Sequence, residues 1–92
     1  MREYVLVEFL VARDEEKNLR TKLDSLGEDF LYIKTEYEYE IDNDWYTETH
    51  WTRVTGKISS MYASVIKLQD PYLAEHMRIS YIPEDLKDKY RR

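Results

Sequence analysis

The spacing of the apolar residues changes along this chain, from every second residue to every third or fourth and back again. This order restricts the possible folds more than any other feature. Residues 3–11 alternate cleanly, with Val5, Val7, Phe9 and Val11 on one side. Such alternation is typical of a strand with one buried face. The opposite side of this segment mixes polar and apolar residues, so we expect it to lie outside the core.

A helix is expected next along the chain. Asp14 can cap its N-terminus, and Leu19, Leu23 and Leu26 follow at helical spacing. Gly27 suits the C-terminal cap. Because this apolar stripe is narrow, we predict that the helix packs on a sheet and keeps most of its surface in water.

Two further strands are predicted from Phe30 to about Ile41 and from Trp45 to about Thr55, joined by the turn residues 42–44. The later of the two strands is rich in Thr and aromatic residues, and the pair is predicted to form a hairpin. In the strand that begins at Phe30, we expect Leu31 and Ile33 to lie under the helices.

Residues 57–69 give conflicting signals. Their Val, Ile, Tyr and Ser content favours a strand, whereas their periodicity favours a helix. At about 100° per residue, one arc of about 160° collects the larger apolar side chains. These are Ile58, Met61, Tyr62, Val65, Ile66 and Leu68. We predict a helix with this arc buried, and the strand remains the alternative.

The remaining residues complete the pattern. Asp70 and Pro71 end the helix, residues 76–82 alternate again, and a last short helix is expected from Pro83. The order is therefore β-α-β-β-α-β. It predicts an α+β, ferredoxin-like fold with a four-stranded antiparallel sheet, two helices on one face and a short C-terminal helix.

Composition restricts the class of protein. The 92 residues suffice for a single domain, residues 1–92, and 42% are apolar while 36% are charged. The absence of Cys excludes disulfides and thiolate metal sites. A net charge of −5 argues against general nucleic-acid binding. Without a leader or an apolar run of membrane length, we expect a cytoplasmic protein, in the host cytoplasm if a virus encodes it, with no membrane contact.

A row of acidic residues is the most distinctive local feature. Between Glu36 and His50 the chain contains no Lys or Arg and six acidic residues: Glu36, Glu38, Glu40, Asp42, Asp44 and Glu48. Side chains two apart on a strand share a face, about 6.8 Å from one another. Each adjacent pair then repels by about 0.6 kcal/mol even in water. Four such steps total about 2.4 kcal/mol before salt screening.

Two interpretations of the row are open. Cross-strand Lys34, Arg53 or Arg78 can neutralise it, or it can be a solvated face that protects a sheet edge from aggregation. Alternatively, the carboxylates imitate DNA phosphates, whose direct spacing along one strand is about twice the 3.4 Å axial rise. In the second case the row would occupy the basic groove of a DNA-binding protein.

A second candidate surface is the sheet face opposite the helices. Tyr4, Leu6, Leu10 and Tyr32 are predicted to lie there, together with Phe30. Exposed apolar groups in such number indicate an interface, and a symmetric homodimer is the simplest one. The alternative is that the C-terminal helix covers this face.

Enzymatic and RNA-binding functions have less support. His50 and His76 are the only histidines, and no phosphate-binding Gly loop or His-x-x-x-His pair occurs. Carboxylates along one strand diverge, so a metal-dependent nuclease is the third hypothesis, and we predict no catalytic residue, no metal and no cofactor. Base stacking on Tyr4 or Tyr32 would place RNA phosphates beside Glu8 and the acidic row.

In size, lack of Cys, abundant Tyr and the acidic row from Glu36 to Asp44, the chain resembles small phage-encoded DNA-mimic inhibitors of the anti-restriction type found in T-even phages. The resemblance implies a non-enzymatic, dimeric, acidic inhibitor. Such a protein occupies the DNA site of a restriction enzyme or nucleoid-associated protein and does not bind nucleic acid itself. The alternative function is a protein–protein adaptor that uses the open sheet face.

Overall fold

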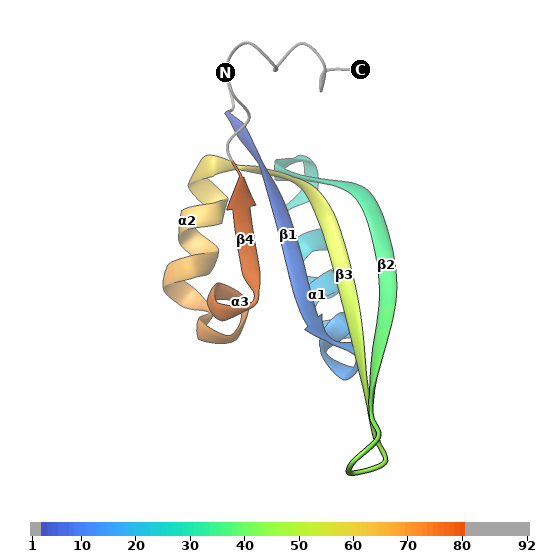
Figure 1. The fold of residues 1–92 in the computed structure, drawn as a ribbon. Helices are drawn as coiled ribbons and strands as arrows, with labels where there is room; N and C mark the ends of the chain where they lie inside the picture. Colours follow the sequence, from blue (N-terminus) through green and yellow to red (C-terminus); the bar gives the residue numbers. More distant parts are fainter. Residues whose placement is uncertain (1–2, 81–92) are drawn as a thin grey trace.

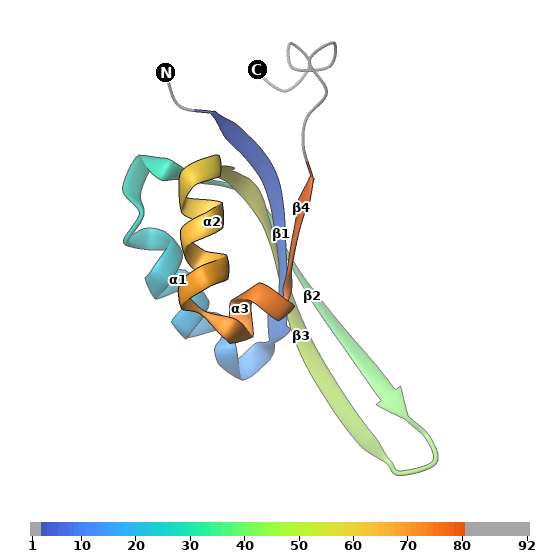
Figure 2. The same cartoon turned by 90° about the vertical axis from the view of Figure 1, so that its left-hand side faces the viewer.

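A computed structural model describes residues 3–80. Four strands form one antiparallel sheet in the order β2-β3-β1-β4, and Figure 1 shows this arrangement. Three helices lie together on one side of the sheet (Figure 2). The elements are β1 (Tyr4–Ala12), α1 (Glu16–Asp24), β2 (Phe30–Asp42), β3 (Thr47–Ser59), α2 (Ser60–Gln69), α3 (Pro71–Glu75) and β4 (Met77–Ser80).

The mixed fold with a four-stranded antiparallel sheet and helices on one face is confirmed. Helix α3 begins directly after Asp70, because Asp70 accepts a hydrogen bond from the Leu73 backbone N–H and Pro71 occupies the first turn. The predicted C-terminal helix from Pro83 lies outside the described residues.

The hydrophobic core lies between the sheet and the helices. Strand β1 alternates as predicted, and its apolar side is buried throughout. This alternation turns every second side chain toward α1 and α2. The core consists of Val5, Val7, Phe9, Val11, Leu19, Leu23, Phe30, Val54, Ile58, Ala63, Ile66 and Leu73.

The predicted caps of the first helix are wrong. Asp14 lies in a 3-10 turn, Arg13–Glu15, and the residue at the N-cap of α1 is Glu15, whose side chain makes no capping hydrogen bond. The helix ends at Ser25, before Gly27, which has a φ of 59° and begins a second 3-10 turn. Tight turns at both ends have shortened the helix.

The helix in the contested segment is confirmed, but it begins at Ser60, because residues 57–59 complete β3 between its two partner strands. The predicted buried arc is partly wrong. Met61 and Leu68 are exposed. Ile66 is buried as predicted, and Ser59 and Ala63, which lie outside the predicted arc, are buried with it at spacings of four and three. Since the strand enters the helix at a buried residue, that residue determines which helix face meets the sheet.

The first half of β2 has the opposite orientation to the one predicted. Phe30 is in the core, and the Tyr32 hydroxyl donates to Asp24 Oδ1 of α1 at 2.8 Å, whereas Leu31 and Ile33 are exposed. The cause is a bulge between Tyr32 and Lys34. One extra residue exchanges the two faces of a strand. After the bulge, the odd-numbered residues face the helix side, as predicted.

Candidate protein-binding surface

Beyond the helices, β2 and β3 continue as a two-stranded ribbon, residues 37–50, which we call the arm. It projects from the body of the protein (Figures 1 and 2) and contributes to overall dimensions of 50 × 28 × 18 Å. Asp42 pairs with Thr47 at its end, and Asp42 Oδ1 accepts a hydrogen bond from the Asp44 backbone N–H at 3.0 Å. The predicted turn is therefore confirmed. Strand β3 begins at Thr47 rather than Trp45, because residues 45 and 46 complete the turn.

Four of the six predicted acidic residues share one face of β2, namely Glu36, Glu38, Glu40 and Asp42. This is the face of the sheet that the helices leave open. Their cross-strand partners are, in turn, Arg53, Trp51, Thr49 and Thr47. Asp44 lies in the turn and Glu48 is paired with Ile41, on the opposite face. The acidic row of the structure therefore consists of Glu36, Glu38, Glu40 and Asp42.

The inner half of the row is neutralised by two of the predicted cations. Arg53 Nη2 lies 3.1 Å from Glu38 Oε2, and Arg53 Nε lies 3.1 Å from Glu8 Oε1. Lys34 Nζ lies 3.5 Å from Glu36 Oε1. These groups remain substantially exposed, so each pair contributes about 0.2–1 kcal/mol. The inner carboxylates therefore have a structural explanation.

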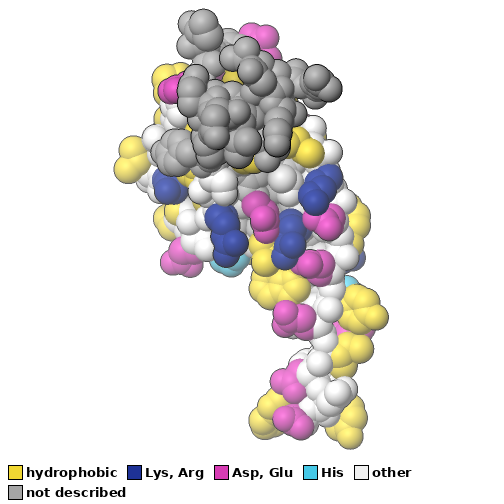
Figure 3. Space-filling model, turned by 45° about the horizontal axis from the view of Figure 1, so that its top comes forward, with side chains coloured by type: hydrophobic (Ala, Val, Ile, Leu, Met, Phe, Trp, Pro, Cys, Tyr) yellow, Lys and Arg dark blue, Asp and Glu magenta, His cyan; other side chains and the backbone are white. Residues whose placement is uncertain are grey.

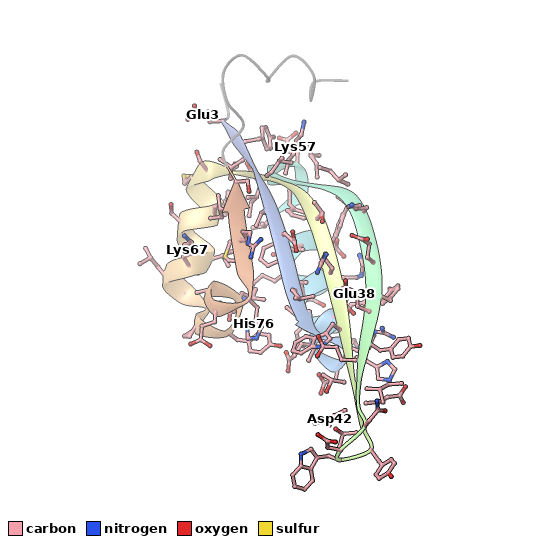
Figure 4. The ribbon with its side chains drawn as sticks, viewed as in Figure 1. Glu3, Glu38, Asp42, Lys57, Lys67 and His76 are labelled. Carbon is pink, nitrogen blue, oxygen red and sulfur yellow. The ribbon has the colours of Figure 1, made fainter. Side chains whose placement is uncertain are left out.

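The outer half of the row has no such neighbours. Glu40 and Asp42 are exposed, and within residues 3–80 neither forms an ion pair with Lys or Arg. The chain contains no Lys or Arg from Thr35 to Thr52. In Figure 3 the arm shows acidic and hydrophobic side chains, while basic and acidic groups alternate on the body above it. Figure 4 shows Asp42 near the end of the arm, and Glu38 nearer the body.

The other face of the arm is aromatic and exposed. Tyr37, Tyr39 and Ile41 are 57%, 61% and 56% exposed, and Tyr39 stacks on His50 with 6.0 Å between ring centroids. At the tip, Trp45 and Tyr46 are 77% and 92% exposed. None of these residues belongs to the core, although Tyr37 and Tyr39 lie in the β2–β3 strand pair. They extend past the helices that would cover them.

A polar network that the sequence did not indicate anchors the base of the arm to α1. Glu16 Oε2 accepts from Arg20 Nε at 2.9 Å and from the Tyr37 hydroxyl at 3.1 Å, while Glu16 Oε1 accepts from the buried Thr52 hydroxyl at 3.0 Å. The hydrogen bond from Arg20 is the main reason why the pKa of Glu16 lies below its usual value. The Arg13 guanidinium lies over the Tyr37 ring, 4.6 Å from its centroid. Only the Glu16–Arg20 spacing of four residues could have suggested this network.

The open sheet face holds three of its five predicted apolar residues, and Phe30 is in the core instead. Tyr4, Leu6 and Leu10 lie there half-buried, and the Tyr4 hydroxyl donates to the Glu28 carbonyl at 2.9 Å. Tyr32 is on the helix side, as the bulge requires, and Leu31 takes its place on the open face. The apolar surface on this face is therefore real but includes a different residue of β2.

No group of three or more His, Cys, Asp or Glu residues within residues 3–80 is arranged to hold a metal ion. His50 lies on the arm, while His76 stacks on Tyr72, and its Nδ1 lies 2.7 Å from the Tyr72 carbonyl oxygen. No helix in the part of the chain that the structure describes could cross a membrane.

Comparisons of the chain with protein-family models, curated proteins and solved structures found no match. The resemblance to phage DNA-mimic inhibitors therefore stays a prediction from composition and from the acidic row. The surface that best distinguishes this molecule is the arm, with carboxylates on one face and aromatic side chains on the other.

Proposed function

We propose that this protein is a non-enzymatic, acidic binding module whose arm occupies the basic DNA-binding surface of another protein. The observation that carries the proposal is the pair Glu40 and Asp42, exposed on a projecting ribbon with no Lys or Arg beside them. Unlike Glu36 and Glu38, they have no basic partner within residues 3–80. Carboxylates two residues apart reproduce the pitch of phosphates along a DNA strand, about 7 Å.

We further infer that the fold is ferredoxin-like. In support, each helix-bearing connection joins two strands that are separated by one antiparallel strand. Strand β3 lies between β1 and β2, and β1 lies between β3 and β4. This is the split β-α-β arrangement. It places the β2–β3 hairpin at one side of the sheet, where it is free to project.

The partner that this proposal predicts is a DNA-binding protein, such as a restriction enzyme or a nucleoid-associated protein of the host. The number of free carboxylates on the arm is small, so the contact should be local. If Glu40 and Asp42 each make one charge-assisted hydrogen bond worth about 1 kcal/mol, removing both weakens binding about thirtyfold. Exposed Trp45 and Tyr46 would add apolar contact at the tip.

The test is displacement of a labelled DNA duplex from such proteins, recovered from a bacterial lysate on the immobilised chain and eluted with competitor DNA. Glu40→Gln and Asp42→Asn together should weaken displacement about thirtyfold. Glu3→Gln and Glu75→Gln form the matched control, since they remove the same charge away from the arm (Figure 4 labels Glu3 at the opposite end). Equal loss in both variants would show that net charge alone acts and would contradict the proposal.

The open sheet face supports a second function, an adaptor or homodimer contact. Leu6 and Leu10 lie on it with Leu31, which is exposed. We expect a homodimer of about twice the 11.3 kDa chain mass, whose sedimentation coefficient changes little between about 50 and 300 mM NaCl because apolar contacts are not screened. Leu6→Lys should give a monomer. A wild-type monomer at micromolar concentration would refute this second function.

A further inference from the structure

Within residues 3–80, the outer edge of β2 is a strand edge without a paired strand. Strand β2 is the last in the sheet and hydrogen-bonds only to β3 among the described strands. After the bulge at Lys34, its pairing with β3 continues without a shift from Glu36 to Asp42. This stretch is about 20 Å long. No other described strand pairs with the backbone groups that point away from β3, and the one side-chain contact to the backbone of this stretch is a long hydrogen bond of 3.5 Å from Arg13 Nη2 to the Glu38 carbonyl oxygen.

The two faces of this edge carry different chemistry. The open face presents carboxylates from Glu36 to Asp42, and the other face presents Tyr37, Tyr39 and Ile41, each more than half exposed. A strand added beside β2 would place its alternate side chains on the same two faces, whichever direction it runs. Its complement is therefore a segment in which Lys or Arg alternates with apolar residues.

A second copy of this chain does not fit the edge. Pairing β2 with β2 would set carboxylates directly opposite carboxylates, about 5 Å apart, which is unfavourable. The same repulsion is a common protection of edge strands against self-association. An uncharged strand would avoid this repulsion, and a strand of opposite charge would replace it with attraction, so charge complementarity favours a basic segment from a different protein.

We infer that the edge of β2 from Glu36 to Asp42 accepts an extended basic–apolar segment of a partner protein as a fifth strand. The inference rests on the proposed function in one respect, since both require a basic partner. It adds the mode of binding: main-chain hydrogen bonds along the edge supply affinity, and the alternation of side chains supplies selectivity.

Two peptides of about nine residues, matched in length to an ordinary strand, test the mode of binding. In one, Lys and Val alternate, and in the other the same residues form a Lys block and a Val block. The alternating peptide should bind at least about tenfold more tightly at low salt. Hydrogen exchange should slow at those amides of residues 36–42 that exchange rapidly in the free protein. Ile41→Thr, which keeps strand propensity, should weaken this binding, and Leu68→Thr on α2 is the matched control.

N-methylation provides the decisive measurement. Methylating every second residue of the alternating peptide removes the backbone donors of one edge and leaves the side chains unchanged. One of the two methylated forms should fail to bind and the other should bind, because an added strand uses only one of its edges. Equal binding of both forms, equal binding of the alternating and block peptides, or no binding by the alternating peptide would each overturn strand addition. DNA displacement by the arm could still occur in each case, so failure of this inference is distinguishable from failure of the proposed function.

Discussion

Replacing Gly56 with Ala tests the packing that orients β2. Gly56 is buried in β3, between Val7 of β1 and Tyr32 of β2. A Cβ atom at this position would lie 2.5 Å from Phe30 Cζ and 2.6 Å from the Leu31 carbonyl oxygen. Both distances are far below van der Waals contact. Gly56 therefore leaves the space in which the Phe30 ring reaches the core, next to the bulge.

The expected cost follows from what can move. The Phe30 ring is buried edge-to-face against Phe9, 6.4 Å between centroids, and the Leu31 oxygen belongs to the backbone. Overpacking of this kind costs about 1–3 kcal/mol, and we take the upper end because both atoms are confined. Ala also reduces the entropy of the unfolded chain, which offsets about 0.4–1 kcal/mol. The net loss should be about 2 kcal/mol, which corresponds to a melting temperature about 10 °C lower in a domain of this size.

Gly27→Ala is the matched control. No heavy atom lies within 4 Å of a Cβ there, and only the φ of 59° opposes Ala. That backbone strain is about 1–2 kcal/mol before the same entropic gain of about 0.4–1 kcal/mol, so the net cost should lie between about 0 and 1.6 kcal/mol. Urea denaturation followed by circular dichroism gives both free energies of unfolding. A Gly56→Ala variant that loses no more stability than Gly27→Ala would refute the packing argument.

The other predictions concern two carboxylates with pKa values below their usual range, Glu16 chiefly through its hydrogen bond from Arg20 and Asp70 chiefly through its hydrogen bond from Lys22. A carboxyl group whose pKa is lowered by folding stabilises the protein above its unfolded pKa, and this contribution is lost as the pH falls through the folded value. Urea denaturation from pH 6 to pH 3 should therefore show a smaller loss of stability in Glu16→Gln than in the wild type; an unchanged pH profile would contradict this. Asp70→Asn should flatten the profile likewise, while Asp70→Ala should cost about 1 kcal/mol more than Asp70→Asn at neutral pH, because Asn still caps the Leu73 backbone N–H. Equal stability of these two variants would argue against the cap.

The elements that sequence reasoning predicted well are those with one dry face and no irregularity. Strand β1 is the clearest example, because its buried residues alternate without interruption. The orientation of the first half of β2 could not be predicted. The segment Phe30–Ile33 carries apolar or aromatic side chains on both of its faces, so the bulge leaves no trace in the alternation. The structure places Gly56 in the interior of β3, where a glycine commonly marks a bulge or a close approach of another residue, but the predicted strand ended at about Thr55, so this signal was missed.

The exposure of the arm could have been predicted from lengths. A strand of 13 residues such as β2 or β3 extends about 43 Å, whereas α1 with 9 residues extends about 14 Å. Helices of this size cannot cover such strands, so part of the hairpin must project. Aromatic residues in the projecting part, such as Tyr39 and Trp45, then lack a core to enter. The alternation of apolar and polar residues did not reveal this exposure. It shows which residues share a face of the strand, but not whether a helix covers that face.

The position of Arg53 divides the acidic row into a part that the fold explains and a part that it does not. Arg53 is paired in register with Glu36 and contacts Glu38, so it offsets repulsion among the inner carboxylates. Of the strand steps, only Glu38–Glu40 and Glu40–Asp42 remain without a cation between them, about 1.2 kcal/mol of repulsion in water before screening. Within residues 3–80 neither outer carboxylate forms an ion pair with Lys or Arg, and the one printed contact is the hydrogen bond that Asp42 Oδ1 accepts from the Asp44 backbone N–H. Amides would remove the repulsion and keep that acceptor oxygen, so the fold does not need the charges themselves. These outer charges oppose folding and lie at the end of a ribbon outside the core, and they are the charges to which the proposed function assigns a partner outside the chain.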